Sequence, residues 1–435
     1  MKKYVILLLI VLLGLAWFSA ASDMVNDPIK AKEHIEKAEE LVEKEIYVDA
    51  VTEYESALEY EPGNEELYMK IADAYLKSGD SREFISICED TAEKYQENTQ
   101  AMDTLMNYYV ENNDEDKAVK YLKDFLEEYP DNENAQKWFT KLEGSYTELY
   151  CRYDEMSEIV NDSMVVLDED LYGLTDALGN EIVSCEYRQM YPFSEEGFAL
   201  AMTEDGRWVY IDEDGQIRKA PDKDYENLGM YTEDGTVAEK DGQYGYLDEE
   251  MEPVGEFQWD NLTGIKNGIG AGEKNGKWSL VNKKGKEKGE DSYEDVITDL
   301  YGFCSSQKRI FVKKDGVYHL INTKGKEEGD LTFDDARAFT EDGYAAVCKD
   351  GKWGFVNSDG ELVIDYTYEE AESFQNGFAP VAVDGKWGYI NEEGTMVIQP
   401  EFLKATHISE KGTAAVMTEQ QGETVWKLLQ LNLFQ

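Results

Sequence analysis

The pattern of hydrophobic and polar positions changes near residue 160 of this 435-residue chain. Between residues 27 and 142, apolar residues recur at three- and four-residue spacing, which is typical of amphipathic helices. Beyond residue 160 they fall in short runs with a period of two, such as Tyr344–Cys348, and glycine-containing turns separate these runs. The sequence therefore predicts a helical part over residues 24–160 and a β-rich part over residues 161–435, an α+β multidomain protein. The segment from Asn134 to Val160 is expected to continue helical and to cap the helical stack.

One stretch of the β-rich part occurs twice almost unchanged. Asp350–Gly360 returns as Asp384–Gly394, and in each copy two turns bracket a short aromatic strand. Asp-Gly supplies the positive φ angles that a two-residue hairpin needs, and Asn-x-x-Gly closes the next turn with a left-handed glycine. Each copy therefore predicts a hairpin, an aromatic strand, a second turn and a third strand.

Weaker copies of this unit fill the remaining β-rich part. Eight units are spaced 34 to 40 residues apart, and each is centred on one aromatic residue: Tyr172, Trp208, Tyr244, Trp278, Tyr318, Trp353, Trp387 and Trp426. We call these eight residues the signature aromatics. A period in this range is typical of repeat architectures, in which small sheets must stack to bury both faces.

The β-rich part is accordingly expected to be β-propeller-like, with about seven or eight units of three or four strands. An open stack of small sheets is the alternative. The last unit, centred on Trp426, lacks a third strand, which another part of the chain would supply if a ring closes. The signature aromatics are expected to pack between units, although a repeated aromatic could instead line a sugar- or peptide-binding surface.

The two full copies also identify a family resemblance. Trp353-Gly354 and Trp387-Gly388, each inside the Asp-Gly-Lys-Trp-Gly motif, resemble the WG (or KWG) repeat family, and the resemblance extends over about residues 165–433. Elsewhere the Trp-Gly pair is eroded, for example to Trp278-Ser279. The resemblance supports the repeat architecture and implies no particular partner.

The helical part carries a second repeat, of 34 residues. Small residues and a proline stand at set places of the first unit, namely Ala38, Ala50, Ala57 and Pro62. This pattern resembles the tetratricopeptide repeat, in which small residues let two helices approach closely and the proline separates units. The resemblance covers three units and implies a groove lined by the first helix of each.

In this family, the ninth place of each unit faces the groove. Here those places hold Glu39, Asp73 and Asn107. Family members that grip a peptide carboxylate use Lys and Asn there, so the two acidic residues imply a partner with a basic or neutral segment. A solvated acidic face with no ligand is the other interpretation.

Composition and charge exclude several function classes. The chain has 93 acidic and 42 basic residues, a formal charge of −51, which disfavours nucleic acid and anionic lipid surfaces as partners. No phosphate-binding loop, His-Glu-x-x-His motif or nucleophile elbow occurs, and the five cysteines form no Cys-x-x-Cys pair. The three histidines (His34, His319 and His407) are expected to be incidental. No catalytic residue and no cofactor site is predicted. No metal site is predicted either, because the acidic turns lack the ligand ladder of a calcium loop.

The function predicted from these features is that of a non-enzymatic interaction scaffold. A glycan-binding or glycan-cleaving propeller of the cell envelope is the alternative. Inward-pointing carboxylates together with exposed Trp residues at one end of the ring would favour the glycan protein. Buried aromatic and small residues closing the ring would favour the scaffold.

Residues 1–23 have the parts of a secretion signal or a membrane anchor. Lys2 and Lys3 precede an apolar run that extends to Ala21, and small residues follow at its end. The run is just long enough to span a bilayer, so cleavage and retention as an anchor both remain open. Either outcome places the rest of the protein outside the cytoplasm.

We therefore expect fractionation of cells that express the whole chain to place it in the membrane fraction or in the medium. The physical reason is the uncharged, largely apolar run after Lys3, which favours partition into the membrane during export. Quantitative immunoblotting of the fractions checks this, with a variant lacking residues 1–23 as the control. A main pool of full-length protein in the soluble cytoplasmic fraction would rule the export element out.

Overall fold

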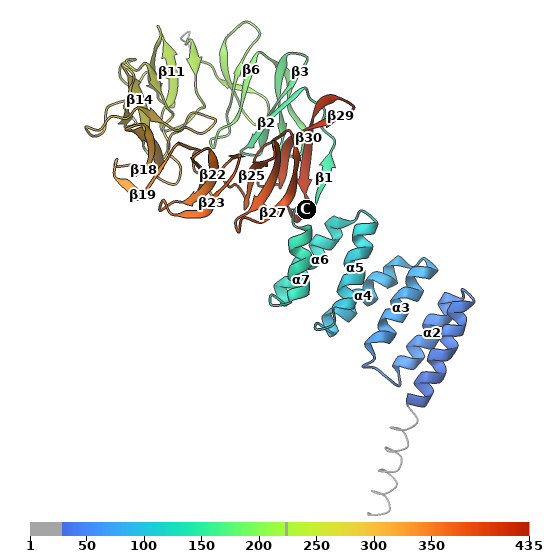
Figure 1. The fold of residues 1–435 in the computed structure, drawn as a ribbon. Coiled ribbons are helices and arrows are strands. Elements are labelled where there is room, and N and C mark those ends of the chain that lie inside the picture. Colours follow the sequence, from blue (N-terminus) through green and yellow to red (C-terminus); the bar gives the residue numbers. More distant parts are fainter. Residues whose placement is uncertain (1–27, 222–224, 435) are drawn as a thin grey trace, which may run out of the picture. The chain divides into compact units, whose positions relative to one another are not determined.

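The computed structural model describes residues 28–221 and 225–434 (Figure 1), and the predicted signal or anchor at residues 1–23 lies outside them. Within the described residues, no helix is both long and apolar enough to cross a membrane. The chain divides into two compact units, the first ending at Thr140 and the second beginning at Lys141. We call them the helical unit and the β unit.

The helical unit is a run of helices in which each packs against the next (Figure 1). Residues 28–43 are helical, and the following helices are α2 (Tyr47–Leu58), α3 (Glu65–Ser78), α4 (Ser81–Lys94), α5 (Thr99–Glu111), α6 (Glu115–Glu128) and α7 (Glu133–Leu142). Ala38, Ala50 and Ala57 have no exposed surface, which confirms that small residues mark the close approach of paired helices. Gly79 ends α3 with φ of 86°, and the side chain of Asp80 then caps α4 by accepting a hydrogen bond from the Glu83 N–H.

The predicted helical cap between Asn134 and Val160 is wrong beyond Leu142. Two strands follow α7, namely β1 (Tyr146–Leu149) and β2 (Glu155–Val160), and both belong to the β unit. The units therefore divide twenty residues before the predicted boundary at 160. Short apolar runs fit a helical and an extended period about equally well, and here the strands that they pair with decide between them.

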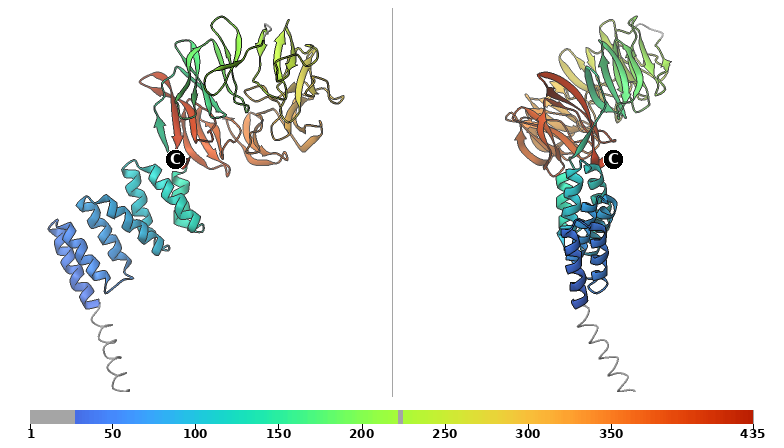
Figure 2. Two further views of the ribbon diagram at one scale, coloured as in Figure 1. Left: turned by 180° about the vertical axis from the view of Figure 1, so that it is seen from behind. Right: turned by 90° about the vertical axis from the view of Figure 1, so that its right-hand side faces the viewer.

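The β unit is an eight-bladed propeller, in which eight antiparallel sheets follow one another around a ring (Figures 1 and 2). Blades 1 to 4 consist of β2, β3 (Ser163–Asp168), β4 (Leu171–Asp176) and β5 (Glu181–Tyr187); β6 (Gln189–Phe193), β7 (Ala199–Met202), β8 (Trp208–Ile211) and β9 (Ile217–Lys219); β10 (Asn227–Leu228), β11 (Thr236–Lys240) and β12 (Gln243–Leu247); and β13 (Asn261–Leu262), β14 (Gly270–Lys274) and β15 (Lys277–Val281).

Blades 5 to 8 consist of β16 (Asp295–Val296), β17 (Arg309–Lys314), β18 (Val317–Asn322) and β19 (Glu327–Phe333); β20 (Asp335–Ala336), β21 (Tyr344–Lys349), β22 (Lys352–Asn357) and β23 (Leu362–Tyr368); β24 (Glu370–Ala371), β25 (Phe378–Val383), β26 (Lys386–Asn391) and β27 (Met396–Phe402); and β28 (Lys404–Ala405), β29 (Thr413–Gln420), β30 (Glu423–Leu431) and β1. A short helical turn, η1 (Asn432–Phe434), follows β30. The first strand of each blade, often only two residues long, was not predicted from the sequence, where it falls in the connector between units.

Strand β1 closes the ring by completing the last blade. It pairs antiparallel with β30, so that Tyr146 faces Leu431 and Leu149 faces Leu428. Asn432 fastens the same junction, because its backbone N–H donates to the Ser145 carbonyl at 2.9 Å and its side chain donates to the Ser145 hydroxyl at 3.1 Å. The prediction that a strand from elsewhere completes the unit centred on Trp426 is confirmed.

The two turns that the sequence predicted have the expected geometry. Asp350 and Gly351 both have positive φ, at 51° and 74°, as a two-residue hairpin of the I′ type requires. In the next turn, the Asn357 side chain accepts hydrogen bonds from the backbone N–H groups of Asp359 and Glu361. Gly360 closes that turn with φ of 77°.

An acidic residue in the connector before each of six blades holds the hairpin of that blade in place. Its carboxylate accepts a hydrogen bond from a backbone N–H of the hairpin turn. The pairs are Asp154 with Glu169, Glu226 with Gly242, Asp260 with Asn275, Glu294 with Gly316, Asp334 with Asp350, and Glu369 with Gly385. Part of the large acidic charge therefore has a structural use in every such blade.

The glycine of the Trp-Gly pair is required by the neighbouring strand. A β-carbon on Gly354 would lie 2.5 Å from the backbone oxygen of Ile364, and one on Gly388 would lie closer still to that of Ile398. The strands are irregular at the same place, because the register shifts between Trp353 and Phe355. Only glycine allows the outer strand to approach so closely.

Neighbouring blades share their cores. One cluster joins Trp353 and Phe355 of blade 6 to Ala379 and Val381 of blade 7. In three blades, a tyrosine two places after the signature aromatic also donates its hydroxyl hydrogen to a backbone carbonyl of the next blade, namely Tyr210 to Gly229, Tyr246 to Thr263 and Tyr389 to Thr406. Buried hydroxyls that find such partners fix the position of one blade against the next.

The signature aromatics lie on the third strand of each blade. Trp208, Tyr318 and Trp353 are buried, and the other five are partly buried. Trp353 is 4% exposed, and the guanidinium carbon of Arg337 lies 4.3 Å from its ring centroid. The structural role expected of these residues is therefore best tested at Trp353.

We expect Trp353→Ala to lower the free energy of unfolding by about 3–5 kcal/mol, because it leaves a large cavity between blades 6 and 7. Trp387→Ala, at a partly buried position, should cost less. Denaturant unfolding of the two variants beside the wild-type protein checks this order. An unchanged unfolding midpoint for Trp353→Ala would contradict the structural role.

A chain that begins at residue 151 loses β1 and should melt at a lower temperature than a chain that begins at residue 141. Without β1, the edge of β30 is open, so the shorter chain should also associate. Thermal unfolding and sedimentation velocity measure the two effects, with the full-length protein as reference. Equal melting temperatures of the two shortened chains would show that β1 does not hold the ring closed.

Candidate functional site

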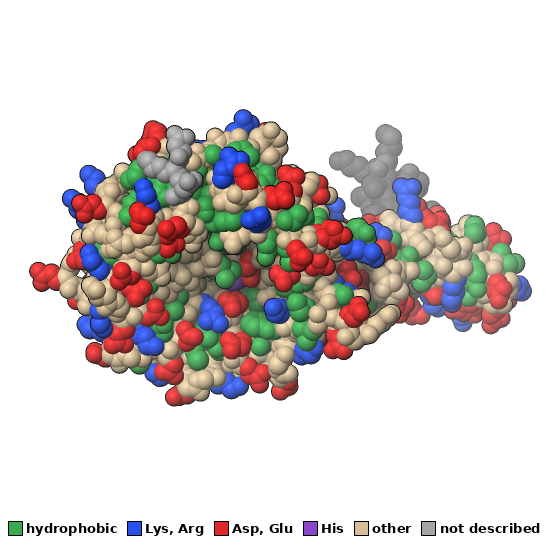
Figure 3. All heavy atoms as spheres, turned by 90° about the horizontal axis from the view of Figure 1, so that it is seen from above, with side chains coloured by type: hydrophobic (Ala, Val, Ile, Leu, Met, Phe, Trp, Pro, Cys, Tyr) green, Lys and Arg blue, Asp and Glu red, His purple; other side chains and the backbone are tan. Residues whose placement is uncertain are grey.

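The centre of the propeller holds a cavity of about 890 Å³ to which all eight blades contribute. Its walls come from the end of the short first strand of each blade and from the loop that follows that strand. Figure 3 shows the corresponding hollow in the surface of the β unit. No signature aromatic lines this cavity.

The side chains around the cavity are mostly acidic. Two permanently charged cations, Lys266 and Arg337, face ten carboxylates, which belong to Glu158, Asp162, Glu195, Glu196, Asp234, Asp299, Glu341, Asp342, Glu372 and Glu410. Some of these carboxylates are engaged at the rim; Glu196 accepts a hydrogen bond from the Glu233 N–H, and Asp342 accepts one from the Gly377 N–H. The cavity nevertheless keeps a clear negative excess, which a low-dielectric wall strengthens.

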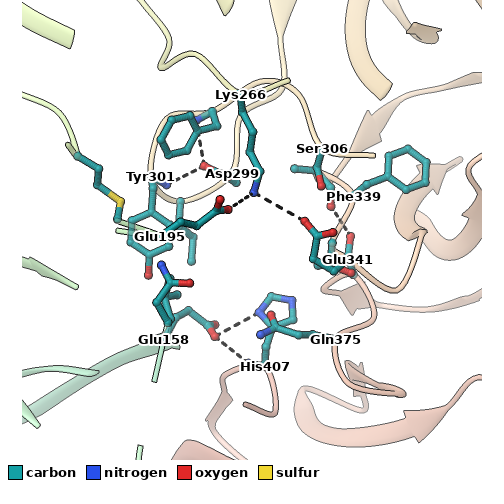
Figure 4. A pocket seen from close by; sticks show the side chains of 18 of the residues that line it. Glu158, Glu195, Lys266, Asp299, Tyr301, Ser306, Phe339, Glu341, Gln375 and His407 are labelled. Carbon is teal, nitrogen blue, oxygen red and sulfur yellow. Dashed lines mark hydrogen bonds and ion pairs between the residues drawn. The ribbon is translucent and has the colours of Figure 1, made fainter. Parts of the chain in front are cut away.

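Lys266 reaches from blade 4 between carboxylates of two other blades (Figure 4). Its Nζ lies 3.1 Å from the Oε1 of Glu195 in blade 2 and 3.8 Å from the Oε1 of Glu341 in blade 6. Burial lowers the pKa of Lys266, but Glu195, Glu341 and Asp299 outweigh burial and raise that pKa above its ordinary value. The ammonium is therefore held charged.

His407 and Glu158 form a second pair in the wall (Figure 4). The Nδ1 of His407 lies 3.2 Å from the Oε2 of Glu158, and that oxygen also accepts the backbone N–H of His407 at 2.8 Å. Burial lowers the pKa of His407, whereas the Glu158 carboxylate raises it, and the net shift is upward. The Nε2 of His407 is buried and has no hydrogen-bond partner among the described residues.

Arg337 connects the cavity to the repeat core. Its guanidinium group stacks over Trp353, and its Nε lies 3.2 Å from the Oε2 of Glu372. Burial raises the pKa of Glu372 even though Arg337 opposes the shift. One face of the Arg337 guanidinium group therefore lies against the Trp353 ring, and the edge of the guanidinium group lies toward Glu372 in the cavity wall.

The loop after the first strand is longest in blade 5, where residues 297–308 join β16 to β17. Asp299 shapes it by accepting hydrogen bonds from the backbone N–H groups of Tyr301 and Phe303. Burial raises the pKa of Asp299, although these N–H groups oppose the shift. The loop brings Tyr301 and the 70% exposed Leu300 to the cavity.

The predicted groove residues of the helical unit lie on first helices as expected, but two of them are already paired. Glu39 accepts a hydrogen bond from Lys70 at 2.7 Å, and Asp73 accepts one from Lys77 at 2.7 Å. Asn107 is exposed on α5. The face is therefore less acidic than the three positions alone indicate.

The cavity was not predicted from the sequence, and His407 was expected to be incidental, although the loops around the cavity carry a repeated signal. A Ser or Thr followed by acidic residues precedes a glycine in several units, as in Ser194–Gly197, Thr232–Gly235 and Thr340–Gly343. Residues at equivalent positions of successive repeat units lie in the same region of a ring. Once the blade order is known, this recurrence predicts an acidic rim.

No group of three or more potential ligand side chains that could hold a metal ion occurs in the part of the chain that the structure describes. The inward carboxylates expected of a glycan protein are present, but no Trp lines the cavity, whose aromatic residues are Tyr301, Phe303 and Phe339.

Comparison with known proteins agrees with the repeats. A family described as "WG containing repeat" matches residues 172–208, 244–278, 320–353, 353–387 and 387–420, and a family described as "Tetratricopeptide repeat" matches residues 41–107. No curated protein matches the chain.

Solved structures that match parts of the chain include a eukaryotic initiation factor at 10% identity and a TM-score of 0.42, with 65% of this chain and 88% of that chain covered. Hsv2 of Kluyveromyces lactis is 10% identical, with a TM-score of 0.36 and coverage of 62% and 94%. The tetratricopeptide domain of P58(IPK) is 23% identical, with a TM-score of 0.20 and coverage of 27% and 33%. The two family matches give the classification: the chain carries tetratricopeptide repeats in its N-terminal part and WG-containing repeats in its propeller.

Proposed function

We propose that this protein is a non-enzymatic interaction scaffold that acts outside the cytoplasm. The observation that carries the proposal is the presence in one chain of two repeat units, tetratricopeptide and WG-propeller, that both present broad surfaces. Secretion or anchoring by residues 1–23 is part of the proposal and rests on the apolar run there.

The geometry of the cavity supports binding rather than catalysis. Several of its titratable groups bind one another, Glu158 with His407 and Glu372 with Arg337. A catalytic base would instead be aimed at a nucleophile or at a substrate position. The groups in the cavity thus act together as a charged wall.

The charge of the protein indicates the kind of partner. With a formal charge of −51, the protein attracts segments that are basic and tolerates neutral ones, while acidic segments are repelled. Such a partner would associate faster at low salt because the Debye length shortens from about 10 Å at 0.1 M to about 3 Å at 1 M ionic strength.

A parallel screen of the full-length protein on peptide and glycan arrays tests the proposal. Basic and neutral peptides should be retained in a salt-sensitive manner, and acidic peptides and glycans should not. A sugar-release assay on the retained glycans covers the enzymatic alternative. Retention of glycans without peptides, or release of sugar, would contradict the scaffold and favour the glycan-binding or glycan-cleaving propeller.

A double variant separates the two possible binding surfaces. Glu39→Gln with Asp73→Asn leaves Lys77 unpaired and Lys70 with Glu66 as its remaining partner, so basic peptides that use the helical groove should bind about tenfold more weakly. Glu127→Gln, an exposed change of one charge on α6, is the matched control. Unchanged binding in the double variant would exclude the predicted groove and leave the propeller as the binding surface.

A further inference from the structure

We propose that the central cavity of the propeller binds an aliphatic ammonium group, of the kind carried by a lysine side chain or a polyamine. This inference rests on the proposed binding role and assigns a site and a ligand chemistry to it. The cavity is formed entirely within the β unit, by all eight blades.

The chain itself shows what the cavity can hold. The ammonium of Lys266 lies between Glu195 and Glu341, which belong to different blades (Figure 4). Both carboxylates are largely exposed, with side-chain exposures of 71% and 77%, so they are open to a second cation from solvent. An incoming ammonium could therefore join Lys266 or replace it between the same two groups.

One buried polar atom of the wall lacks a partner within the described residues. Ser194 is 4% exposed and lines the cavity beside Glu195, yet its hydroxyl makes no hydrogen bond. A buried polar atom is costly unless it is bonded, which points to a ligand that supplies the missing bond.

An ammonium group can supply the hydrogen bond that the Ser194 hydroxyl lacks. It carries three donors and no acceptor, and the Ser194 oxygen can accept a hydrogen bond from it. Four of the ten carboxylates already have a partner, namely Asp162 with Lys411, Asp234 with Lys283, Glu158 with His407 and Glu372 with Arg337. The others, among them Glu195 and Glu341, supply the charge that offsets the desolvation of a cation on entry.

The remaining wall fits a chain of methylene groups. Ile265, Leu300 and Phe339 are apolar residues of the lining, and long ammonium side chains bury their stems against such surfaces. The volume of about 890 Å³ lies within the range of ligand sites and exceeds what a bare ion needs. An anionic ligand would meet the carboxylates and be repelled.

Isothermal titration of the full-length protein with three probes tests the proposal. The probes are an acetylated and amidated tri-lysine peptide, spermidine, and the corresponding tri-glutamate peptide, each at low and at physiological salt. We expect at least one cation to bind with an affinity that falls as salt rises, and the tri-glutamate peptide not to bind.

Three variants locate the site. Glu195→Gln should weaken binding about tenfold, because it removes one carboxylate and leaves Lys266 less neutralised. Lys266→Met removes the competing ammonium at similar volume and should strengthen binding by a similar factor. Glu290→Gln, exposed and outside the cavity, makes the same charge change as Glu195→Gln and should have no effect. Melting temperatures confirm that each variant is folded, and the opposite effects of the first two variants cannot both arise from loss of structure.

The outcomes distinguish a protein segment from a small polyamine as the ligand, and they distinguish failure of this site from failure of the scaffold role. Binding of the tri-lysine peptide alone indicates a protein segment, binding of spermidine alone indicates a small polyamine, and binding of both indicates recognition of the ammonium itself; each supports the site if the variants respond as expected. Binding of neither cation, or binding that Glu195→Gln and Lys266→Met leave unchanged, overturns it. Failed titrations beside a positive peptide array would remove the cavity as the site and leave the scaffold role intact.

Discussion

The ring of the propeller depends on one contact that joins the start of the β unit to its end. Here the closing contact is the pairing of β1 with β30, which the hydrogen bonds of Asn432 with Ser145 reinforce. Every other blade is formed from consecutive strands, so this junction alone joins the two ends of the β unit. The shape of the central cavity depends on it, because eight blades can face one point only in a closed ring.

Much of the fold could be predicted from local chemistry. Asp350-Gly351 demands a two-residue hairpin whatever surrounds it, and the repeated aromatic places one strand in each unit. The small residues at Ala38 and Ala50 likewise indicated close helix pairs. These signals are strong because a positive φ angle or a close backbone approach tolerates few residue types.

The parts that were missed depend on distant partners. The sequence of β1 does not by itself distinguish strand from helix, and its identity follows from β30, which comes near the other end of the unit. The cavity was missed for a similar reason. Ser194, Lys266 and His407 are far apart in the sequence and meet only because the ring brings the first strand of every blade to one axis.

Ring closure also has a consequence for the order in which the protein can fold. The bond between the Thr147 hydroxyl and the Asn432 side chain spans 285 residues, and such non-local pairings form slowly because a long loop must first be ordered. As the chain leaves the ribosome, β1 emerges before the blades and must wait for β30. Until then, β1 has no partner strand, and the nascent protein carries an unpaired strand that is prone to misassociation.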